Sequence, residues 1–218
     1  MRIGLTGPIG SGKSLVASVW ASLGAGIVEG DVMGRRALET DADMRRSLAE
    51  RFGAGILNAE GLIDRSALAE AAFATAEGRA ELTRLTFPTL YRLAQAEMGR
   101  LEQDGAQVVV FDAALIFEWG VERDFDRIVV VTAPKKLLID RATQRLNISR
   151  GEAENRLRAQ LSPAEKVRRA DYVIFNNTNI EELTGRAKEV WGVVLRAENQ
   201  EPRAKTKAPS AKSLVTTH

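Results

Sequence analysis

Residues 7–14 of this chain read GPIGSGKS, which fits the pattern G-x-x-x-x-G-K-S/T from Gly7 to Ser14. Glycines allow main-chain N–H groups to turn inward around a phosphate, and a helix that follows adds the positive end of its dipole. Lys13 can bridge the β- and γ-phosphates of a nucleotide, and the hydroxyl of Ser14 can coordinate Mg²⁺. The motif therefore predicts nucleotide binding and leaves the reaction open.

Carboxylates follow two of the apolar runs that suggest strands. Asp112 ends the run QVVVFD, where it can hold Mg²⁺ directly or through water, or can simply form a solvated turn. Asp31 is expected to end the second strand, where its carboxylate could accept the proton of an attacking hydroxyl, or could cap a helix that starts near Val32. Glu29 would share a strand face with Asp31, which makes it a supporting group.

A cluster of arginines follows the fourth apolar run. Arg141 and Arg145 are four residues apart and would share a helix face, and Arg150 and Arg156 come after a turn near Asn147. Guanidinium groups suit the negative charge that phosphoryl transfer spreads over the moving group, so this region predicts a mobile lid. For any one of these arginines, a solvated helix surface remains an equal alternative.

The composition restricts the chemistry. The chain has no cysteine and its one histidine is His218, so any general base must be a carboxylate or a lysine. No apolar stretch approaches the roughly 18 residues of a membrane span, and a strand follows Met1 directly in place of a signal peptide. We expect a cytoplasmic enzyme that binds small molecules, with no nucleic-acid or membrane partner and no obligatory protein partner.

The C-terminal segment 196–218 differs from the rest of the chain. It carries five basic and two acidic residues, which leaves 26 basic and 27 acidic residues elsewhere. With two prolines and almost no apolar periodicity, it is expected to be a disordered tail, with a solubilising role favoured over a nucleic-acid arm.

The apolar runs alternate with helical patterns, which predicts an α/β fold with a doubly wound, five-stranded parallel sheet, as in P-loop nucleotide kinases. The strands are expected at residues 2–6, 25–31, 107–112, 127–133 and 171–175. The core would comprise residues 1–31, 107–134 and 169–195, with an arginine-rich helical lid at residues 135–168.

One interval is too long for a simple crossover between strands. Residues 32–106 are helical in pattern, with helices expected at about 34–52, 64–74 and 77–103, the second capped by Asp64 ahead of an apolar face of Leu68, Ala71 and Ala72. An insertion after the second strand would lie at the carboxyl edge of the sheet, where open α/β sheets bind ligands. This interval is therefore expected to bind a second substrate.

Taken in order, these segments resemble the dephospho-coenzyme A kinase family over about residues 3–185. The segments that carry the resemblance are LTGPIGSGKS, IVEGDVMGR, GLIDRSALAEAAF, LTRLTFP, FDAALIFEWG, FDRIVVV, DRATQR, ENRLRAQ and ADYVIFNN. The resemblance implies ATP-dependent phosphorylation of the ribose 3′-hydroxyl of dephospho-coenzyme A, the last step of coenzyme A biosynthesis, with Mg²⁺ as the metal.

The resemblance also assigns residues. It implies that Asp31, Lys13 and Arg141 are catalytic, with Arg141 as the lid arginine and Arg156 as a weaker candidate. It implies ATP binding by Gly10, Ser11, Gly12, Lys13, Ser14, Leu15 and Arg145, and by Asn176 near the adenine. It implies acceptor binding by Arg65, Leu115, Glu118 and the position of Phe87, and metal binding by Ser14 and Asp112.

The chain departs from the family pattern at three positions. Glu29 replaces the usual first aspartate of the motif at the second strand, and Ala114 replaces the usual proline of the Pro-Leu-Leu-Phe-Glu segment. Phe87 stands where the family usually has histidine before Pro88, and a phenyl ring cannot donate a hydrogen bond. We expect this third change to lower affinity for the acceptor or to shift its identity.

Two alternatives remain open from the sequence. The chain could be another P-loop kinase that acts on a nucleotide or another small molecule, or a nucleotide-sensing module without catalysis. An expected base at Asp31 and an arginine lid both argue against the sensor.

Overall fold

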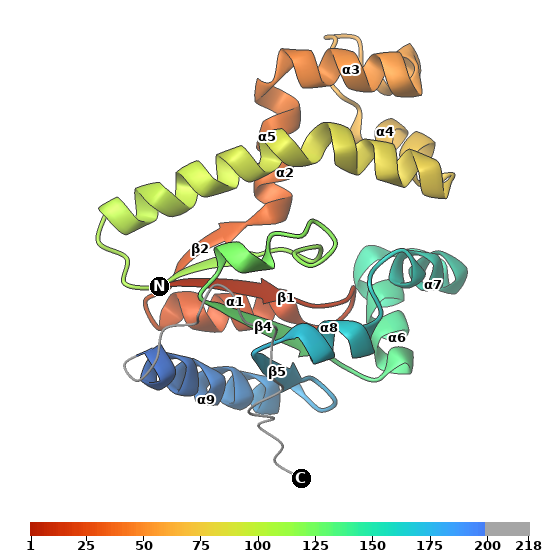
Figure 1. Ribbon diagram of the computed structural model, residues 1–218. Helices are drawn as coiled ribbons and strands as arrows, with labels where there is room; N and C mark the ends of the chain where they lie inside the picture. The colour runs from red at the N-terminus through yellow and green to blue at the C-terminus, as the bar shows by residue number, and fades with distance from the viewer. Residues whose placement is uncertain (199–218) are drawn as a thin grey trace. The chain divides into compact units, whose positions relative to one another are not determined.

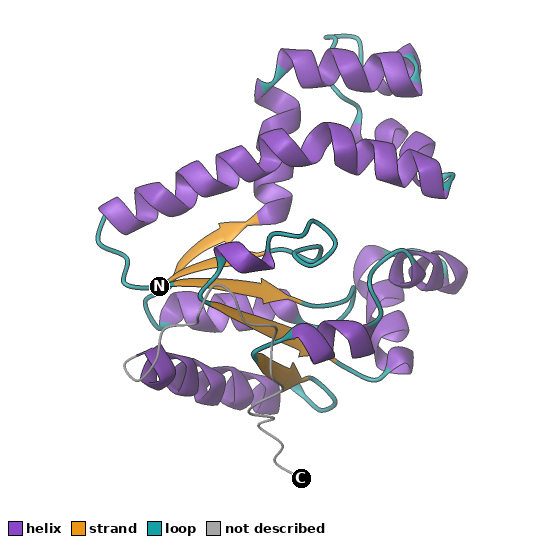
Figure 2. Ribbon diagram, in the orientation of Figure 1, coloured by secondary structure: helices purple, strands orange, loops and turns teal. Residues whose placement is uncertain are grey.

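The computed structural model describes residues 1–198. The described chain divides into two compact units, one formed by residues 1–27 and 100–198 and one formed by residues 28–99. Figures 1 and 2 show strands flanked by helices in the first unit, and helices alone beyond the end of β2 in the second.

The strands form a five-stranded sheet in the order β2-β3-β1-β4-β5. Their bounds are β1 (Arg2–Thr6), β2 (Gly26–Glu29), β3 (Val109–Asp112), β4 (Arg127–Thr132) and β5 (Tyr172–Phe175). β1 pairs in parallel with both β3 and β4, and β4 pairs in parallel with β5. The predicted sheet is confirmed, with strands shorter than expected by up to three residues.

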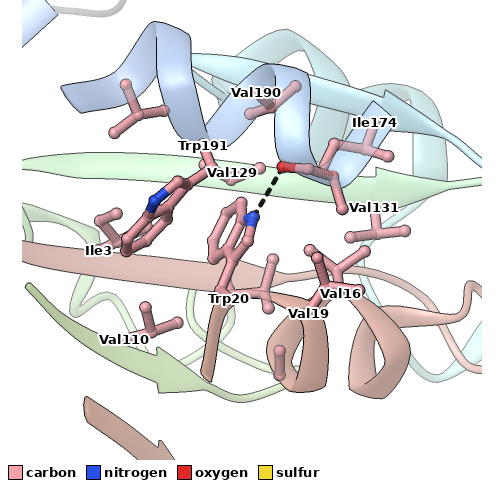
Figure 3. Close-up of a cluster of buried hydrophobic side chains, with 14 of the residues drawn as sticks. Ile3, Val16, Val19, Trp20, Val110, Val129, Val131, Ile174, Val190 and Trp191 are labelled. Atoms are coloured by element: carbon pink, nitrogen blue, oxygen red, sulfur yellow. Dashed lines mark hydrogen bonds between the residues drawn. The ribbon is translucent and has the colours of Figure 1, made fainter. Parts of the chain in front are cut away.

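One face of the sheet is covered by two helices, α1 (Lys13–Ser22) and α9 (Ile180–Glu198). Side chains that alternate along the strands, such as Ile3 and Leu5, point into this layer. Figure 3 shows its centre, where the rings of Trp20 and Trp191 lie 5.5 Å apart and the indole N–H of Trp20 donates to the carbonyl of Ala187 at 2.8 Å. The layer anchors α1, which carries the residues after the glycine loop.

The other face of the sheet is covered by the segment after β3 and by the helix α8 (Pro163–Arg169). Gly4 leaves room there, since an added Cβ would lie 2.5 Å from the Ile128 side chain. The rings of Phe111 and Phe125 stack with centroids 5.8 Å apart. Because both faces are covered, the sheet is doubly wound and its central strands are buried, as their continuous apolar runs predicted.

The predicted lid region resolves into three helices. These are α6 (Lys135–Leu146), α7 (Arg150–Arg158) and α8. The turn expected near Asn147 is present, because Asn147 ends α6 in the left-handed conformation with φ of 51°. The hydroxyls of Ser149 and Ser162 then cap α7 and α8 by accepting from N–H groups three residues later.

The second unit contains four α-helices and one short 3₁₀ helix among its described residues. Their bounds are α2 (Gly30–Thr40), α3 (Ala42–Phe52), η1 (Ala54–Ile56), α4 (Arg65–Phe73) and α5 (Ala76–Gln103), the last of which runs on into the first unit. Asp64 caps α4 as predicted, with its carboxylate accepting from Ser66 and Ala67. Leu68 and Ala72 of the predicted apolar face are buried, but Ala71 is exposed.

The single helix expected over residues 34–52 is wrong. The chain forms two helices there, because Asp41 leaves helical geometry and its side chain accepts from the N–H of Met44 at 2.9 Å, which starts α3.

The expected position of Asp31 at the end of a strand is also wrong. β2 ends at Glu29 and α2 begins at Gly30 with no loop between them, so Asp31 lies in the first helical turn. Glu29 is the N-cap residue of α2, although its side chain makes no capping hydrogen bond. The two carboxylates therefore do not share a strand face.

The first three residues of the predicted tail are helical, not disordered. Residues 196–198 belong to α9, and the remainder of the tail lies outside the described residues. In the part of the chain that is described, no helix is long and apolar enough to cross a membrane.

Candidate active site

The glycine loop between β1 and α1 is shaped by two glycines with positive φ. Gly10 and Gly12 have φ of 78° and 89°, which side chains rarely adopt. A Cβ on Gly12 would also lie 2.4 Å from the side-chain nitrogen of Asn176, and one on Gly10 would lie 2.2 Å from the carbonyl oxygen of Leu138. Both positions therefore require glycine for backbone conformation and for close packing.

The loop presents main-chain donors at the start of α1. Among residues 1–198, the N–H groups of Gly10, Gly12, Lys13 and Ser14 have no protein acceptor, whereas the N–H of Ser11 is held by the carbonyl of Pro8 at 3.1 Å. No acidic residue lies in the first turn of α1. Free N–H groups at a helix N-terminus form a favourable site for an anion.

Lys13 and Asp112 form an ion pair, with the Lys13 ammonium donating to the Asp112 carboxylate. The strand register explains why they meet. β1 and β3 pair with Leu5 opposite Asp112, so the carboxyl end of β3 lies beside the start of the loop that carries Lys13. Two predicted site residues that are 99 positions apart are thus brought together.

The oxygen donors of this site fit a magnesium ion held mainly by a nucleotide. Ser14 is exposed in the first turn of α1, and Asp112 is 6% exposed. Within the described residues there is no group of three or more His, Cys, Asp or Glu side chains that could hold a metal alone. Mg²⁺ bound with nucleotide phosphates takes one or two protein oxygens and needs no such group.

Arg141 and Asn176 also meet. The guanidinium of Arg141, on α6, donates to the main-chain carbonyls of Asn176 at 2.8 Å and Thr178 at 3.3 Å. The buried side chain of Asn176 donates to the carbonyl of Ser11 at 2.8 Å. These contacts join α6, the segment after β5 and the glycine loop.

Three further arginines of the predicted lid lie at the protein surface. Arg145 is exposed, Arg150 pairs with Asp140 at 2.9 Å, and Arg156 pairs with Glu152 at 2.6 Å. For Arg150 and Arg156 these contacts agree with the solvated helix surface that the sequence left open.

The predicted acceptor residues occupy different elements. Arg65 is exposed at the first position of α4, and Phe87 on α5 stacks against Tyr91 with ring centroids 5.3 Å apart. Leu115 is half-buried in the turn after β3. The carboxylate of Glu118 accepts from the ammonium of Lys166 at 2.8 Å and from the N–H of Leu161 at 2.7 Å.

A model of the dephospho-CoA kinase family matches residues 1–182 of the chain. The chain belongs to this family. The resemblance seen in the sequence motifs is confirmed, and with it the expectation of a phosphotransferase.

Relatives of this kinase family match most of the chain. A dephospho-CoA kinase from Geobacter sulfurreducens is 39% identical over 189 residues, which is 87% of this chain and 96% of the relative. A crystal structure of a Thermus thermophilus protein superposes with a TM-score of 0.76 at 33% identity, and the match covers 89% of this chain and 97% of the other. Dephospho-CoA kinase from Campylobacter jejuni gives a TM-score of 0.66 at 25% identity, over 90% of this chain and 98% of the other.

The sequence did not identify Gln160 or Lys166 as site residues, although Gln160 contacts the glycine loop and Lys166 contacts the turn after β3. The side-chain oxygen of Gln160 accepts from the N–H of Ile9 at 3.1 Å. The ammonium of Lys166 donates to the carbonyl of Ala114 at 2.6 Å. Neither residue carries a usable sequence signal, since each is one polar residue in a charge-rich helical stretch.

Proposed function

We propose that the protein transfers the γ-phosphoryl group of ATP to the ribose 3′-hydroxyl of dephospho-coenzyme A, giving ADP and coenzyme A. The observation that carries this proposal is the pairing of Lys13 with Asp112 beside unpaired loop N–H groups, in a chain of the dephospho-CoA kinase family. A cation, main-chain donors and a carboxylate at the end of β3 form the phosphate half of a kinase site.

The loop stabilises charge during transfer. The N–H groups of Gly10, Gly12, Lys13 and Ser14 bind phosphate oxygens, and Leu15 belongs to the same first turn of α1. The Lys13 ammonium and the Arg141 guanidinium face the negative charge that develops on the transferred group. Asn176 holds the loop through Ser11 and contributes to nucleotide binding, and Arg145 supplies a further lid cation.

Asp31 is the proposed general base. Its carboxylate takes the proton of the 3′-hydroxyl as that oxygen bonds to the γ-phosphorus. The bond from the γ-phosphorus to the oxygen that bridges it to the β-phosphate breaks, and ADP leaves with the electron pair. Support for this role is chemical, since the described chain contains no histidine or cysteine that could serve instead.

Ser14 and Asp112 would hold Mg²⁺ together with the phosphates. When bound, this ion neutralises phosphate charge and makes the γ-phosphorus more electrophilic. In this structure the Asp112 carboxylate is paired with the Lys13 ammonium.

Acceptor binding is assigned to Arg65, Phe87, Leu115 and Glu118, and the cytoplasm is the proposed place of action. The partners of this proposal are the two small molecules ATP and dephospho-coenzyme A.

A panel of acceptors tests the function. The full chain is incubated with ATP and Mg²⁺, and ADP release is followed with dephospho-coenzyme A, AMP or no acceptor. We expect ADP release only with dephospho-coenzyme A, together with stoichiometric coenzyme A identified by mass spectrometry. Turnover with AMP alone would identify another small-molecule kinase, and intact ATP with every acceptor would favour a nucleotide sensor. Lys13→Met is the matched inactive control.

A further inference from the structure

Lys166 is a charged side chain that is fully buried. It lies on α8 with 0% of its side chain exposed, against the face of the sheet opposite α1 and α9. A lysine in such a place is unfavourable unless partners match its charge and its donors. Burial lowers the pKa of Lys166, while the nearby Glu118 carboxylate opposes that shift.

The partners of Lys166 belong to one segment. Its ammonium donates to the carbonyl of Ala114 at 2.6 Å and to the two carboxylate oxygens of Glu118 at 2.8 and 3.0 Å. Both residues lie in the turn that follows Asp112. The same α8 contacts this turn a second time, because the Arg169 guanidinium lies 4.6 Å from the ring centre of Phe117 and pairs with Glu122 just after the turn.

The carbonyl of Ala114 is shared with the end of β1. The hydroxyl of Thr6, the residue before Gly7, donates to it at 3.1 Å. The main-chain oxygen of Ala114, two residues beyond Asp112, thus accepts hydrogen bonds from Thr6 of β1 and from Lys166 of α8. Lys13 is also close enough to Lys166 for its charge to lower the pKa of Lys166.

We propose that Lys166 is a positioning residue for phosphoryl transfer, which holds the turn after β3 through the carbonyl of Ala114 and thereby orients Asp112 toward Lys13 and the phosphates. The assignment rests on the proposed kinase activity. Beside its assigned part in acceptor binding, Glu118 matches the charge of Lys166 and accepts from the N–H of Leu161.

If the Lys166–Glu118 ion pair only stabilised the fold, its removal would affect Tm and not the position of Asp112. Three variants separate these two roles. Lys166→Met leaves the Glu118 carboxylate without its cation and should lower Tm. Adding Glu118→Gln removes that charge and should restore most of the lost Tm, because no uncompensated charge is then left beside the apolar side chain at position 166 in the double variant. The single variant Glu118→Gln measures how much Glu118 itself contributes to Tm and to kcat.

If Lys166 positions Asp112, kcat should fall by about 10²-fold in Lys166→Met, because small misplacements of catalytic groups have effects of this size. In the double variant kcat should stay equally low. KM for ATP should change by less than about threefold, since the interaction lost acts in the transition state. Arg168→Met is the matched control, because Arg168 is an exposed α8 residue paired with Glu165. A double variant that regains both Tm and kcat would overturn the proposal.

Amide hydrogen exchange of the free, full-length protein gives a readout that does not depend on turnover. Residues 113–121 should exchange faster in Lys166→Met and in the double variant, and at the wild-type rate in Arg168→Met. Unchanged exchange in that segment would also overturn the proposal. A wild-type protein that is inactive with dephospho-coenzyme A would instead count against the proposed function, while the exchange result would still decide whether Lys166 holds the turn.

Discussion

The side-chain oxygen of Gln160 accepts a hydrogen bond from the main-chain N–H of Ile9 at 3.1 Å. Gln160 follows α7 and Ile9 lies in the glycine loop, so the bond connects the predicted lid to that loop across 151 positions of sequence. The side chain of Ile9 also packs against the apolar cluster of the lid around Leu138, Ala142 and Leu157. The glycine loop and the segment around α7 are therefore joined by a polar and an apolar contact.

Replacing Gln160 by alanine should weaken ATP binding. The loop N–H of Ile9 loses its acceptor, and one hydrogen bond of this kind is worth about 1 kcal/mol, so KM for ATP should rise by about fivefold. Steady-state kinetics at saturating acceptor measure this change. Gln144→Ala, at an exposed position of α6, is the control that should leave KM unaltered. Equal KM values for the two variants would show that the contact is not used.

Asp31→Asn should retain ATP affinity and lower kcat by about 10²-fold or more, because the amide cannot accept the proton of the attacking hydroxyl. Binding of a fluorescent ATP analogue and single-turnover rates separate the two quantities. A kcat equal to that of the wild type would assign Asp31 to the first turn of α2 alone, where its negative charge favours the helix N-terminus.

Phe87→His should lower KM for dephospho-coenzyme A by up to about tenfold, since one added hydrogen bond to a charged group contributes about 1.5 kcal/mol. The imidazole can keep the stacked contact with Tyr91. KM for ATP should not change, because Phe87 is assigned to the acceptor and not to ATP. Initial rates at varied acceptor test this, and Phe87→Leu is the control that changes the ring without adding a donor.

Asp41→Ala should destabilise the helical unit by about 1 kcal/mol near neutral pH, as loss of an N-cap does. The N–H of Met44 and the hydroxyl of Thr89 donate to this carboxylate and lower its pKa below 3.8. A lowered pKa stabilises the fold above pH 3.8, and this contribution disappears as the pH falls through the pKa of the folded state.

Urea unfolding at several pH values measures the difference between the wild type and Asp41→Ala. That difference should shrink below about pH 3.8, the ordinary pKa of the group. Asp43→Ala removes an exposed carboxylate of the same helix and should cost less than about 0.5 kcal/mol. A difference that is constant with pH would show that the carboxylate charge is not involved in capping.

The sequence predicted the strands well because their apolar runs are continuous, as burial on both faces requires. It failed at two helix boundaries, where local signals were weak. Thr40 and Asp41 interrupt a pattern that is otherwise helical from residue 30 to residue 52, and nothing in the run AGIVEGD indicates that α2 starts directly at Gly30.

The sequence by itself determined the phosphate loop, since its glycines, Lys13 and Ser14 lie within eight residues and need only the strand before them and the helix after them. It also determined the fold class and, through ordered motifs, the family. Only the tertiary structure decided which distant groups meet: Lys13 with Asp112, Arg141 with the carbonyl of Asn176, and Lys166 with the carbonyl of Ala114. The reason is that these contacts depend on strand register and on packing of α6 and α8 against the sheet, which join positions 35 to 99 residues apart and leave no periodic trace in the sequence.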